Sequence, residues 1–478
     1  MSEKIRVRFA PSPTGYLHVG GLRTALYNFL FAKQNGGTFI LRIEDTDRTR
    51  YVEGAIENLI KSLKWANIEF DESPNVGGNY GPYIQSERLH IYKKYVDELL
   101  EKKFAYKCFC SEERLDVMRK EMEKLKISPK YDRKCLHLLE EEIQKKLNSS
   151  LPYVVRMKIP ENTTIKFNDI IRGDVEFLSD RIDEQIILKS DGYPTYHLAN
   201  VVDDHLMEIT HVIRGEEWLS SVPKHILLYQ YFGWEIPKMA HLPLLLNFDR
   251  SKLSKRQGDV AVEDYIAKGF LKEALINFVA FLGWNPGDER EIFSLDELIK
   301  EFSLEKVHKA GAIFNLEKLM WMNKQHIMKK SDEELVKFVS AILNNESFSF
   351  DYINNVVRLM KERVNTINEF ITFSNYFFES PKFFDEKSKE KNWTSQTQNH
   401  ILFLINKFEN LNNFSYDEIE TSIKSTSNNF QISTGKIIHP VRLALTGVGM
   451  GPSLYELIEV LGKTEVISRL KNALKILP

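Results

Sequence analysis

The chain has 478 residues, which is too long for one hydrophobic core and predicts three to five domains. Its 65 Lys and Arg residues against 67 Asp and Glu residues leave a formal charge of −2, so no overall positive field attracts nucleic acid, and any RNA must be met by local basic patches. The start resembles neither a secretory signal nor a transit peptide, and the longest apolar stretch, 274–284, is too short to cross a bilayer, so we expect a cytoplasmic protein with no membrane role.

The first predicted unit consists of a strand, a helix and a second strand. Apolar residues alternate over 5–9 as in a half-buried strand, an apolar stripe predicts a helix over about 20–35, and 39–43 is a buried strand. Such a unit directs the free amides of the helix start toward the carboxyl edge of the sheet, where phosphates bind.

Several residues around this unit are candidates for ligand binding. His18 stands just before the helix, where its imidazole can reach a phosphate that backbone amides already hold, and Gly20 and Gly21 allow close backbone approach. Glu44 follows the second strand at the ligand-binding edge, and we expect its carboxylate to hold an amine. Asp47, in the same segment, suits a helix cap.

All three cysteines fall within one short segment. The pattern is Cys108-x-Cys110, a spacer of 24 residues, and Cys135-x-His137. An odd number of cysteines in a chain without an export signal argues against disulfides. Three thiolates and one imidazole make a full tetrahedral shell for zinc, and the alternative is three reduced, buried thiols. We expect a structural zinc that fixes the Lys- and Arg-rich loop between the two pairs against RNA.

Two further segments carry polar groups. Residues 190–205 mix turn, aromatic and amide residues, and the next strand ends in Arg214, whose guanidinium can hold a carboxylate through two hydrogen bonds. Core tyrosines and surface arginines are the plain alternative for these residues.

Lys252 and Lys255 lie in a short basic segment. A flexible ammonium group there would stabilise the transition state of attack at an α-phosphate, and Lys255 is the better candidate. The alternative for this segment is an exposed basic turn. The segment around His18 and this basic segment together are interpreted as the two halves of an ATP site.

The part after about residue 330 is predicted to be helical. Its apolar residues recur with helical spacing on two faces: Leu335, Phe338, Val339 and Ile342 on one, and Ile353, Val356, Val357 and Met360 on the other. A polar, Lys-rich stretch over 380–398 precedes a second helical portion. A helical bundle is the structural interpretation of both portions.

Over essentially its whole length, the chain resembles the bacterial-type glutamyl-tRNA synthetases, which are class I aminoacyl-tRNA synthetases. Residues 8–21 resemble the family's form of the HIGH signature, and Lys252-Leu-Ser-Lys-Arg256 resembles its KMSKS signature. Further blocks of the family are resembled by 43–47, 81–88, 191–200 and 214–218. Gly21 departs from the final histidine of HIGH, and Leu253 and Arg256 vary KMSKS, as is ordinary in this family.

The resemblance implies an α/β fold with a Rossmann-like doubly wound parallel sheet, an inserted α+β acceptor-binding domain and an all-α C-terminal anticodon-binding region. The implied domains are the first catalytic half at 1–88, the zinc-bearing insertion at 89–189, the second catalytic half at 190–235, a stem-contact domain with the KMSKS-like loop at 236–330, and the anticodon-binding region at 331–478, with a linker at about 380–398.

The activity implied by the resemblance is the activation of L-glutamate with ATP and Mg²⁺ to glutamyl-adenylate, and transfer of the glutamyl group to the 3′ end of tRNA(Glu) by a monomeric enzyme. The residues implied to surround glutamate are Arg8, Ser12, Glu44, Tyr196, Asn200 and Arg214, with Arg214 facing the side-chain carboxylate. Those implied to bind ATP are His18, Gly20, Gly21, Ser254 and Lys255, and those implied in catalysis are His18, Lys252 and Lys255. The cysteine pattern matches the zinc-bearing members.

Arg363 lies where discriminating members of the family have an arginine that reads the last anticodon base, which implies charging of tRNA(Glu) alone. The alternatives are a non-discriminating ligase that also charges tRNA(Gln), a glutaminyl-tRNA synthetase, a truncated relative that glutamylates a modified base, a nucleotidyltransferase acting on a small molecule, and a non-catalytic RNA-binding module. The strand-poor C-terminal part argues against the glutaminyl enzyme, and the length of the chain argues against the truncated relative.

Overall fold

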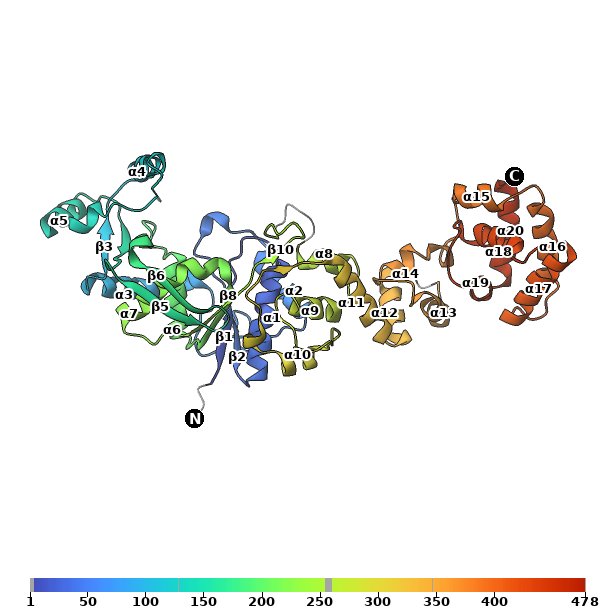
Figure 1. Cartoon of the computed structure of the whole chain (residues 1–478), viewed down its shortest axis with the longest axis horizontal. Helices are drawn as coiled ribbons and strands as arrows, with labels where there is room; N and C mark the ends of the chain where they lie inside the picture. Colours follow the sequence, from blue (N-terminus) through green and yellow to red (C-terminus); the bar gives the residue numbers. More distant parts are fainter. Residues whose placement is uncertain (1–3, 128, 254–259, 346, 478) are drawn as a thin grey trace. The chain divides into compact units, whose positions relative to one another are not determined.

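The computed structural model describes residues 4–127, 129–253, 260–345 and 347–477. The chain divides into two compact units, one formed by 1–265 with 275–316 and the other by 266–274 with 317–478. All strands of the described residues belong to the first unit, and the second is built of helices, so the predicted change from mixed α/β to all-α is confirmed (Figure 1). The five predicted domains divide the chain more finely, and their boundaries stay a prediction.

Two pairs of parallel strands lie at the centre of the first unit, with β1 pairing with β2 and β8 with β9. Their bounds are Arg6–Phe9 for β1, Thr38–Leu41 for β2, His211–Gly215 for β8 and Lys238–Leu242 for β9. The amide of Thr210 donates to the carbonyl of Arg6 at 3.0 Å, which joins the start of β8 to β1. All residues of β1 and β2 are buried, so the expectation of a half-buried first strand was wrong; parallel strands are covered on both faces.

Helix α1 (Val19–Gln34) connects β1 to β2 and confirms the predicted helix and its apolar stripe. The turn after it brings the chain back tightly, since a Cβ added to Gly37 would lie 2.5 Å from the carbonyl oxygen of Ile5. Three further helices of this part are α2 (Ala55–Trp65), α6 (Tyr196–Leu206) and α7 (Val222–Phe232). The side-chain amide of Asn28 donates to the carbonyl of Ile213 at 3.1 Å, which fixes α1 against β8.

The segment between α2 and α6 contributes its own small antiparallel sheet, in the order β3-β4-β7. Its elements are α3 (Leu89–Glu101), β3 (Ala105–Cys108), α4 (Glu112–Lys124), α5 (Glu140–Asn148), β4 (Val154–Met157) and β7 (Ile186–Leu188). A hairpin of β5 (Thr164–Asp169) and β6 (Gly173–Leu178) extends the parallel sheet, whose order is β6-β5-β9-β8.

Two short strands and four α-helices lie between β9 and residue 330 in the described part of the chain. They are β10 (Leu245–Leu246), β11 (Ala312–Ile313), α8 (Val262–Ala267), α9 (Lys272–Ala280), α10 (Leu295–Glu301) and α11 (Leu316–Lys329). Within the described ranges, no helix combines the length and the apolar character that crossing a bilayer requires.

The second unit is a set of helices around one apolar core. Their bounds are α12 (Asp332–Leu343), α13 (Phe350–Met360), α14 (Glu369–Thr372), α15 (Glu386–Asn392), α16 (Thr397–Glu409), α17 (Tyr416–Asn429), α18 (Gly435–Thr446), α19 (Leu454–Leu461) and α20 (Lys463–Ile476). The predicted core face of α13 is confirmed. That of α12 was partly wrong, because Val336 is buried with Leu335 and Val339 whereas Phe338 and Ile342 are 42% and 45% exposed.

Candidate functional site

The start of α1 is built to receive an anion. His18 is the residue that caps the helix, and its Nδ1 accepts a hydrogen bond from the amide of Gly20 at 2.9 Å. Because Nδ1 accepts, the ring proton of the neutral imidazole lies on Nε2, which can donate to an oxygen of a ligand. The first turn of α1 holds no acidic side chain, so nothing there opposes the positive end of the helix dipole.

A cleft of about 460 Å³ opens at this helix start. It gathers residues from the loop after β1, from α1, from the end of β2, from α6 and from β8. The predicted site residues that line it are Arg8, Ser12, His18, Gly20, Gly21, Glu44, Tyr196, Asn200 and Arg214. Segments more than 150 residues apart in the sequence therefore meet at one cavity, since Glu44 and Asn200, which are 156 positions apart, both line it.

The predicted basic segment is described only in part. Lys252 is exposed and does not line the cleft, and the amide of Leu253 donates to the carbonyl of Leu245 at 2.9 Å. Ser254 and Lys255 lie outside the described residues. On the other side of that gap, the carbonyl of Val260 accepts from the amide of Val19 at 2.9 Å, so the chain at this point touches the start of α1.

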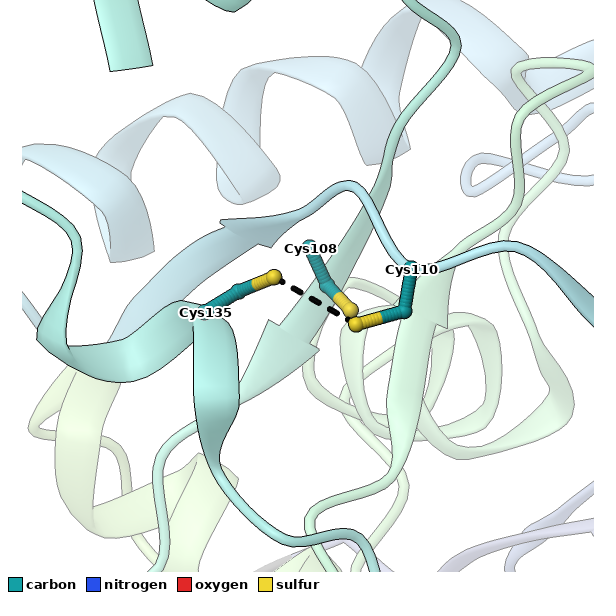
Figure 2. A group of neighbouring side chains, drawn as sticks. All are labelled: Cys108, Cys110 and Cys135. Carbon is teal, nitrogen blue, oxygen red and sulfur yellow. Dashed lines mark hydrogen bonds between the residues drawn. The ribbon is translucent and has the colours of Figure 1, made fainter. Parts of the chain in front are cut away.

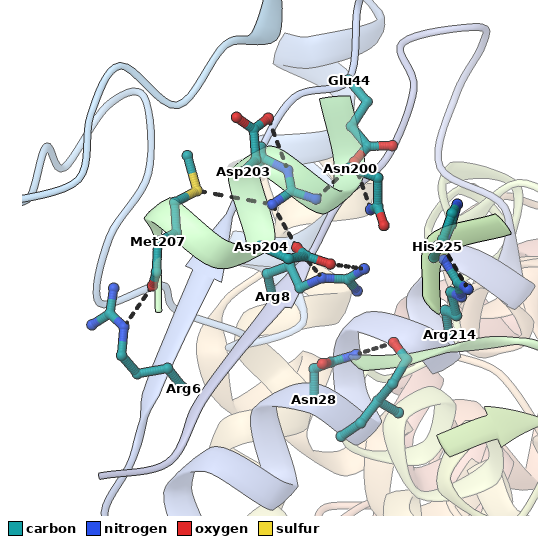
Figure 3. Close-up of polar contacts among 12 residues, drawn as sticks. Arg6, Arg8, Asn28, Glu44, Asn200, Asp203, Asp204, Met207, Arg214 and His225 are labelled. Carbon is teal, nitrogen blue, oxygen red and sulfur yellow. Dashed lines mark hydrogen bonds and ion pairs between the residues drawn. The ribbon is translucent and has the colours of Figure 1, made fainter. Parts of the chain in front are cut away.

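A buried cluster of charges lies behind Arg8 and Glu44, which line the cleft (Figure 3). Asp204 accepts from Arg8 Nε at 2.9 Å and from Arg42 Nη1 at 2.7 Å, and Arg42 Nη2 also donates to Glu44 at 2.9 Å. Asp203 accepts from Arg88 Nε at 2.7 Å. Three guanidinium groups thus meet three carboxylates, and this cluster is neutral as a whole.

Asn200 and Glu44 connect this cluster to the cleft. With the amide of Asn200 turned so that both of its polar atoms are satisfied, its oxygen accepts from Arg42 Nη2 at 3.0 Å and from Arg8 Nη2 at 3.3 Å. Burial raises the pKa of Glu44, and the ion pair with Arg42 opposes that rise. The carboxylate of Glu44 faces the cleft as the acceptor that a bound ammonium group needs.

Arg214, near the end of β8, is held by neutral groups. Its Nη1 donates to Tyr196 Oη at 2.7 Å, its Nε to His241 Nε2 at 3.1 Å, and its Nη2 to His225 Nδ1 at 3.3 Å. Figure 3 shows Arg214 beside His225, apart from the cluster around Asp204. No carboxylate of the described residues forms an ion pair with this guanidinium, which is only 5% exposed.

The histidines around Arg214 are uncharged at neutral pH. Burial, with the positive charges of Lys224 and Arg214, lowers the pKa of His197 to about 3. The same causes lower the pKa of His225 well below its ordinary value. Burial also lowers the pKa of His241. Because Tyr196, His225 and His241 are all neutral, none of the direct partners of Arg214 balances its positive charge. The three bonds above use three of its five N–H groups, and a carboxylate in the cleft is the natural partner of a buried guanidinium fork.

The three cysteines lie together, and their sulfur atoms are within 4.8 Å of one another (Figure 2). Cys110 Sγ is 3.5 Å from Cys135 Sγ. Hydrogen bonds from Cys135 and Tyr131 lower the pKa of the Cys108 thiol to about 4, although burial opposes this, and the thiolate is the form that binds metal. Three thiols that converge on one point fit zinc.

The fourth predicted ligand stands apart from this group. His137 is exposed and does not belong to the set of convergent metal-binding atoms found among the described residues. The hydroxyl of Tyr131 instead lies 3.3 Å from Cys108 Sγ and 3.3 Å from Cys110 Sγ. The sequence prediction did not include Tyr131, because a tyrosine four positions before a cysteine is not a common zinc-ligand pattern.

In the second unit, Arg363 follows α13 and is exposed. Burial, together with the nearby charge of Arg363, lowers the pKa of Arg442. The Nη1 atom of Arg442 is buried without a hydrogen-bond partner among the described residues. Two arginines are thus close together, and the described part of the chain supplies neither of them with an ion pair, which is an arrangement that attracts phosphates or base edges.

The sequence prediction omitted several residues that hold the cleft-lining side chains in place. Asp204 lies one helical turn after Asn200 on α6, so its place on the same face was available from helical spacing. The pairing of Arg42 with Asp204 and of Arg214 with His241 had no such signal, because each depends on which strands become neighbours.

Known proteins match the chain along its length. The family "tRNA synthetases class I (E and Q), catalytic domain" matches residues 4–321, and "Anticodon binding domain" matches residues 325–474. The glutamate–tRNA ligase of Chloroherpeton thalassium is 56% identical over 494 residues, covering 99% of this chain and 98% of that protein. The glutamate–tRNA ligase of Prosthecochloris aestuarii is 53% identical over 499 residues, covering 99% and 98%. The crystal structure of a glutamate tRNA ligase from Elizabethkingia meningosepticum, in complex with its amino acid, has a TM-score of 0.91 at 43% identity and covers 100% of both chains.

Proposed function

Since the chain belongs to the glutamate–tRNA ligases, which are class I aminoacyl-tRNA synthetases, we propose that the cleft at the start of α1 is where it activates L-glutamate with ATP. The family resemblance and the fold class predicted from the sequence are both confirmed. The observation that carries the proposal is Arg214, a buried guanidinium on the cleft that has only neutral direct partners among the described residues.

Each substrate group has a complementary residue in this proposal. Arg214 binds the side-chain carboxylate of glutamate, and the neutral amide of glutamine would leave its charge unpaired. Glu44 holds the α-ammonium group. The other contacts to glutamate come from Arg8, Ser12, Tyr196 and Asn200, all of which line the same cleft. Arg8 and Asn200 are fixed by the charge cluster around Asp204, so these contacts are rigid before the substrate arrives.

The phosphates of ATP bind at the start of α1. The amides at Gly20 and Gly21 and the Nε2–H of His18 donate to them, and Mg²⁺ accompanies the nucleotide. We also propose that the phosphates are contacted by Lys252, Ser254 and Lys255. The hydrogen bond between the amide of Val19 and the carbonyl of Val260 supports this, because Val260 lies a few positions after these residues and is next to the start of α1. The α-carboxylate of glutamate attacks the α-phosphate and pyrophosphate leaves; the terminal ribose hydroxyl of tRNA then takes the glutamyl group and AMP is released. No protein nucleophile takes part, so catalysis consists of positioning and charge stabilisation.

One assay tests this function directly. The purified chain is incubated with ATP, Mg²⁺ and either labelled glutamate or labelled glutamine, on tRNA(Glu) and on tRNA(Gln) separately. We expect charging of tRNA(Glu) with glutamate alone. A nucleotidyltransferase acting on a small molecule, or a non-catalytic RNA-binding module, would give no charged tRNA.

We propose that the enzyme works in the cytoplasm as a monomer. Sedimentation at working concentration measures the oligomeric state.

Arg363 is proposed to restrict charging to tRNA(Glu). Its exposed guanidinium beside Arg442 supports contact with the anticodon. We expect Arg363→Gln to raise the charging of tRNA(Gln) relative to tRNA(Glu) by about tenfold, because one bidentate contact to a base contributes ~1–3 kcal/mol of discrimination. The measurement is kcat/KM for both tRNAs, with Arg358→Gln on α13 as the matched control. Equal charging of both tRNAs by the unchanged chain would make the proposal wrong.

A structural zinc is proposed at Cys108, Cys110 and Cys135, with His137 as the fourth ligand that the spacing predicts. The metal would clip the basic segment between the cysteine pairs to β3, where it can meet the acceptor end of tRNA. Tyr131 is the second candidate for the fourth position, because its hydroxyl lies close to two thiols.

Metal analysis decides both questions. We expect about one zinc per chain in the purified protein and loss of the metal in Cys135→Ser, because a three-ligand shell binds zinc far more weakly. Fewer than about 0.2 zinc per chain in the unchanged protein would contradict the site. His137→Ala and Tyr131→Phe, dialysed against the same chelator, identify the fourth ligand by which variant loses zinc faster.

A further inference from the structure

Arg214 lies in a row of three buried side chains that crosses the parallel sheet. Arg214 on β8 and His241 on β9 are direct partners in the strand register, and Asp169 ends β5, which pairs with β9. His241 Nε2 accepts from Arg214 Nε at 3.1 Å, and His241 Nδ1 is 2.6 Å from Asp169 Oδ2. Asp169 and His241 are 1% and 0% exposed.

The chemistry of a guanidinium fixes every proton in this row. A guanidinium only donates hydrogen bonds, so His241 Nε2 must be unprotonated and the ring proton must be on Nδ1, from which it is donated to Asp169. Burial opposes the charge of Asp169, but hydrogen bonds from His241 and from the amide of Arg172 outweigh it and lower the pKa of this carboxyl. Burial lowers the pKa of His241 as well, so the pair is a carboxylate and a neutral imidazole.

Asp169 is itself held rigidly. Its Oδ1 accepts from the amide of Ile171 at 3.0 Å and from the amide of Arg172 at 2.9 Å, which leaves Oδ2 directed at His241. The negative charge that balances Arg214 therefore stands one imidazole ring away. A carboxylate in direct contact would occupy the guanidinium and compete with a substrate carboxylate, whereas a neutral ring orients Arg214 and leaves its charge available.

We propose that Asp169 and His241 are positioning residues for Arg214: Asp169 sets the tautomer of His241, and His241 sets the plane of the guanidinium that receives the side-chain carboxylate of glutamate. This inference rests on the proposed role of Arg214 and adds the residues that make it selective for a carboxylate.

The variant Asp169→Asn tests the proposal, because it changes one atom in the row. The oxygen of asparagine can keep the hydrogen bonds to Ile171 and Arg172, and its NH₂ group then faces His241 Nδ1 in place of Oδ2. Nδ1 must now accept, the ring proton moves to Nε2, and Nε2–H opposes the Nε–H of Arg214. We expect KM for glutamate to rise about tenfold or more, because a buried donor is left without an acceptor, while KM for ATP stays unchanged.

Two further measurements separate positioning from mere structural support. Nitrogen-15 NMR of histidine-labelled protein should report the Nδ1–H tautomer of His241 in the unchanged chain and the Nε2–H tautomer in Asp169→Asn. Asp174→Asn, at an exposed position of the same hairpin, is the matched control and should change neither the tautomer nor KM. A switched tautomer with an unchanged KM for glutamate, or equal losses for glutamate and ATP, would overturn the proposal.

A second pair of variants keeps the test decisive if Asp169→Asn fails to fold. In His241→Gln, the side chain can still donate to Asp169 and accept from Arg214, so KM for glutamate should stay near that of the unchanged enzyme. His241→Leu can do neither and should raise KM selectively. Equal KM values for glutamate in these two variants would refute the positioning role. Absence of glutamate charging by the unchanged chain would refute the proposed function instead, and the NMR tautomer would still report on the row.

Discussion

The variant Arg214→Gln is expected to lose nearly all glutamate activation. The substitution keeps a polar side chain of similar reach but removes the only buried positive charge on the cleft that has no carboxylate partner among the described residues. Losing one side of a buried, hydrogen-bonded charge pair costs about 3–4 kcal/mol, so kcat/KM for glutamate should fall by roughly a hundredfold to a thousandfold. The measurement is pyrophosphate exchange that depends on glutamate and tRNA(Glu).

Arg214→Lys shows which property of the arginine matters. Lysine keeps the charge but has no planar fork, so it should recover only a small part of the lost activity. Arg290→Gln is the control, since it removes an arginine with a half-exposed side chain elsewhere in the first unit and should leave KM for glutamate unchanged. An Arg214→Gln enzyme with an unaltered KM for glutamate would show that the side-chain carboxylate binds elsewhere.

The second large effect is expected on stability, from Asp204→Ala. This carboxylate is 1% exposed and accepts from both Arg8 and Arg42, so its removal leaves two guanidinium groups buried in a cluster with too few negative charges. Breaking a buried pair in this way costs about 3–5 kcal/mol in the free energy of unfolding. The urea midpoint of the first unit, followed by tryptophan fluorescence, measures the loss.

The control for this prediction is Glu98→Gln, which removes the exposed ion pair with Lys102. Exposed pairs of this kind contribute ~0.3–0.5 kcal/mol, so its urea midpoint should hardly move. If Asp204→Ala and Glu98→Gln destabilise the chain equally, the buried cluster does not have the energetic role assigned to it.

Asp204 also predicts how stability depends on pH. Burial would raise the pKa of this carboxyl, but Arg8 and Arg42 outweigh burial and lower it below its unfolded value. A lowered pKa in the folded state means that the stabilisation is complete above the unfolded pKa of about 3.9 and is lost as the pH falls through the folded value. The difference in stability between the unchanged chain and Asp204→Asn should therefore be constant near neutral pH and shrink in acid.

Much of the fold was predictable because its signals are local. The helix α1 follows from an apolar stripe and the glycines after it, and the expected ligand-binding edge follows from the strand-helix-strand unit. The same reasoning placed Glu44 and Arg214 at strand ends, and both line one cleft together with Tyr196, which the family resemblance indicated.

What the sequence did not predict depends on long-range pairing. Arg8 and Asp204 are 196 positions apart, and Arg214 meets His241 and Asp169 only because β8, β9 and β5 are neighbours in one sheet. On α12, helical spacing alone did not tell which of several apolar residues face the core, because exposed apolar residues such as Phe338 are tolerated on a surface. The exposed position of His137 likewise depends on the path of a loop.

The charge cluster has a consequence for how the polypeptide is made. Arg8 and Arg88 find their carboxylates on α6, 196 and 115 residues later in the chain. At about 5–20 residues per second, a ribosome takes roughly 6–23 s to extend the nascent chain from Arg88 to Asp203. Until α6 emerges, Arg8 on β1 and Arg88 after the N-terminal strands lack the carboxylates that they pair with in the folded chain. Cotranslational closure of this buried cluster must therefore wait for α6, because its guanidinium groups are paired only once Asp203 and Asp204 are present.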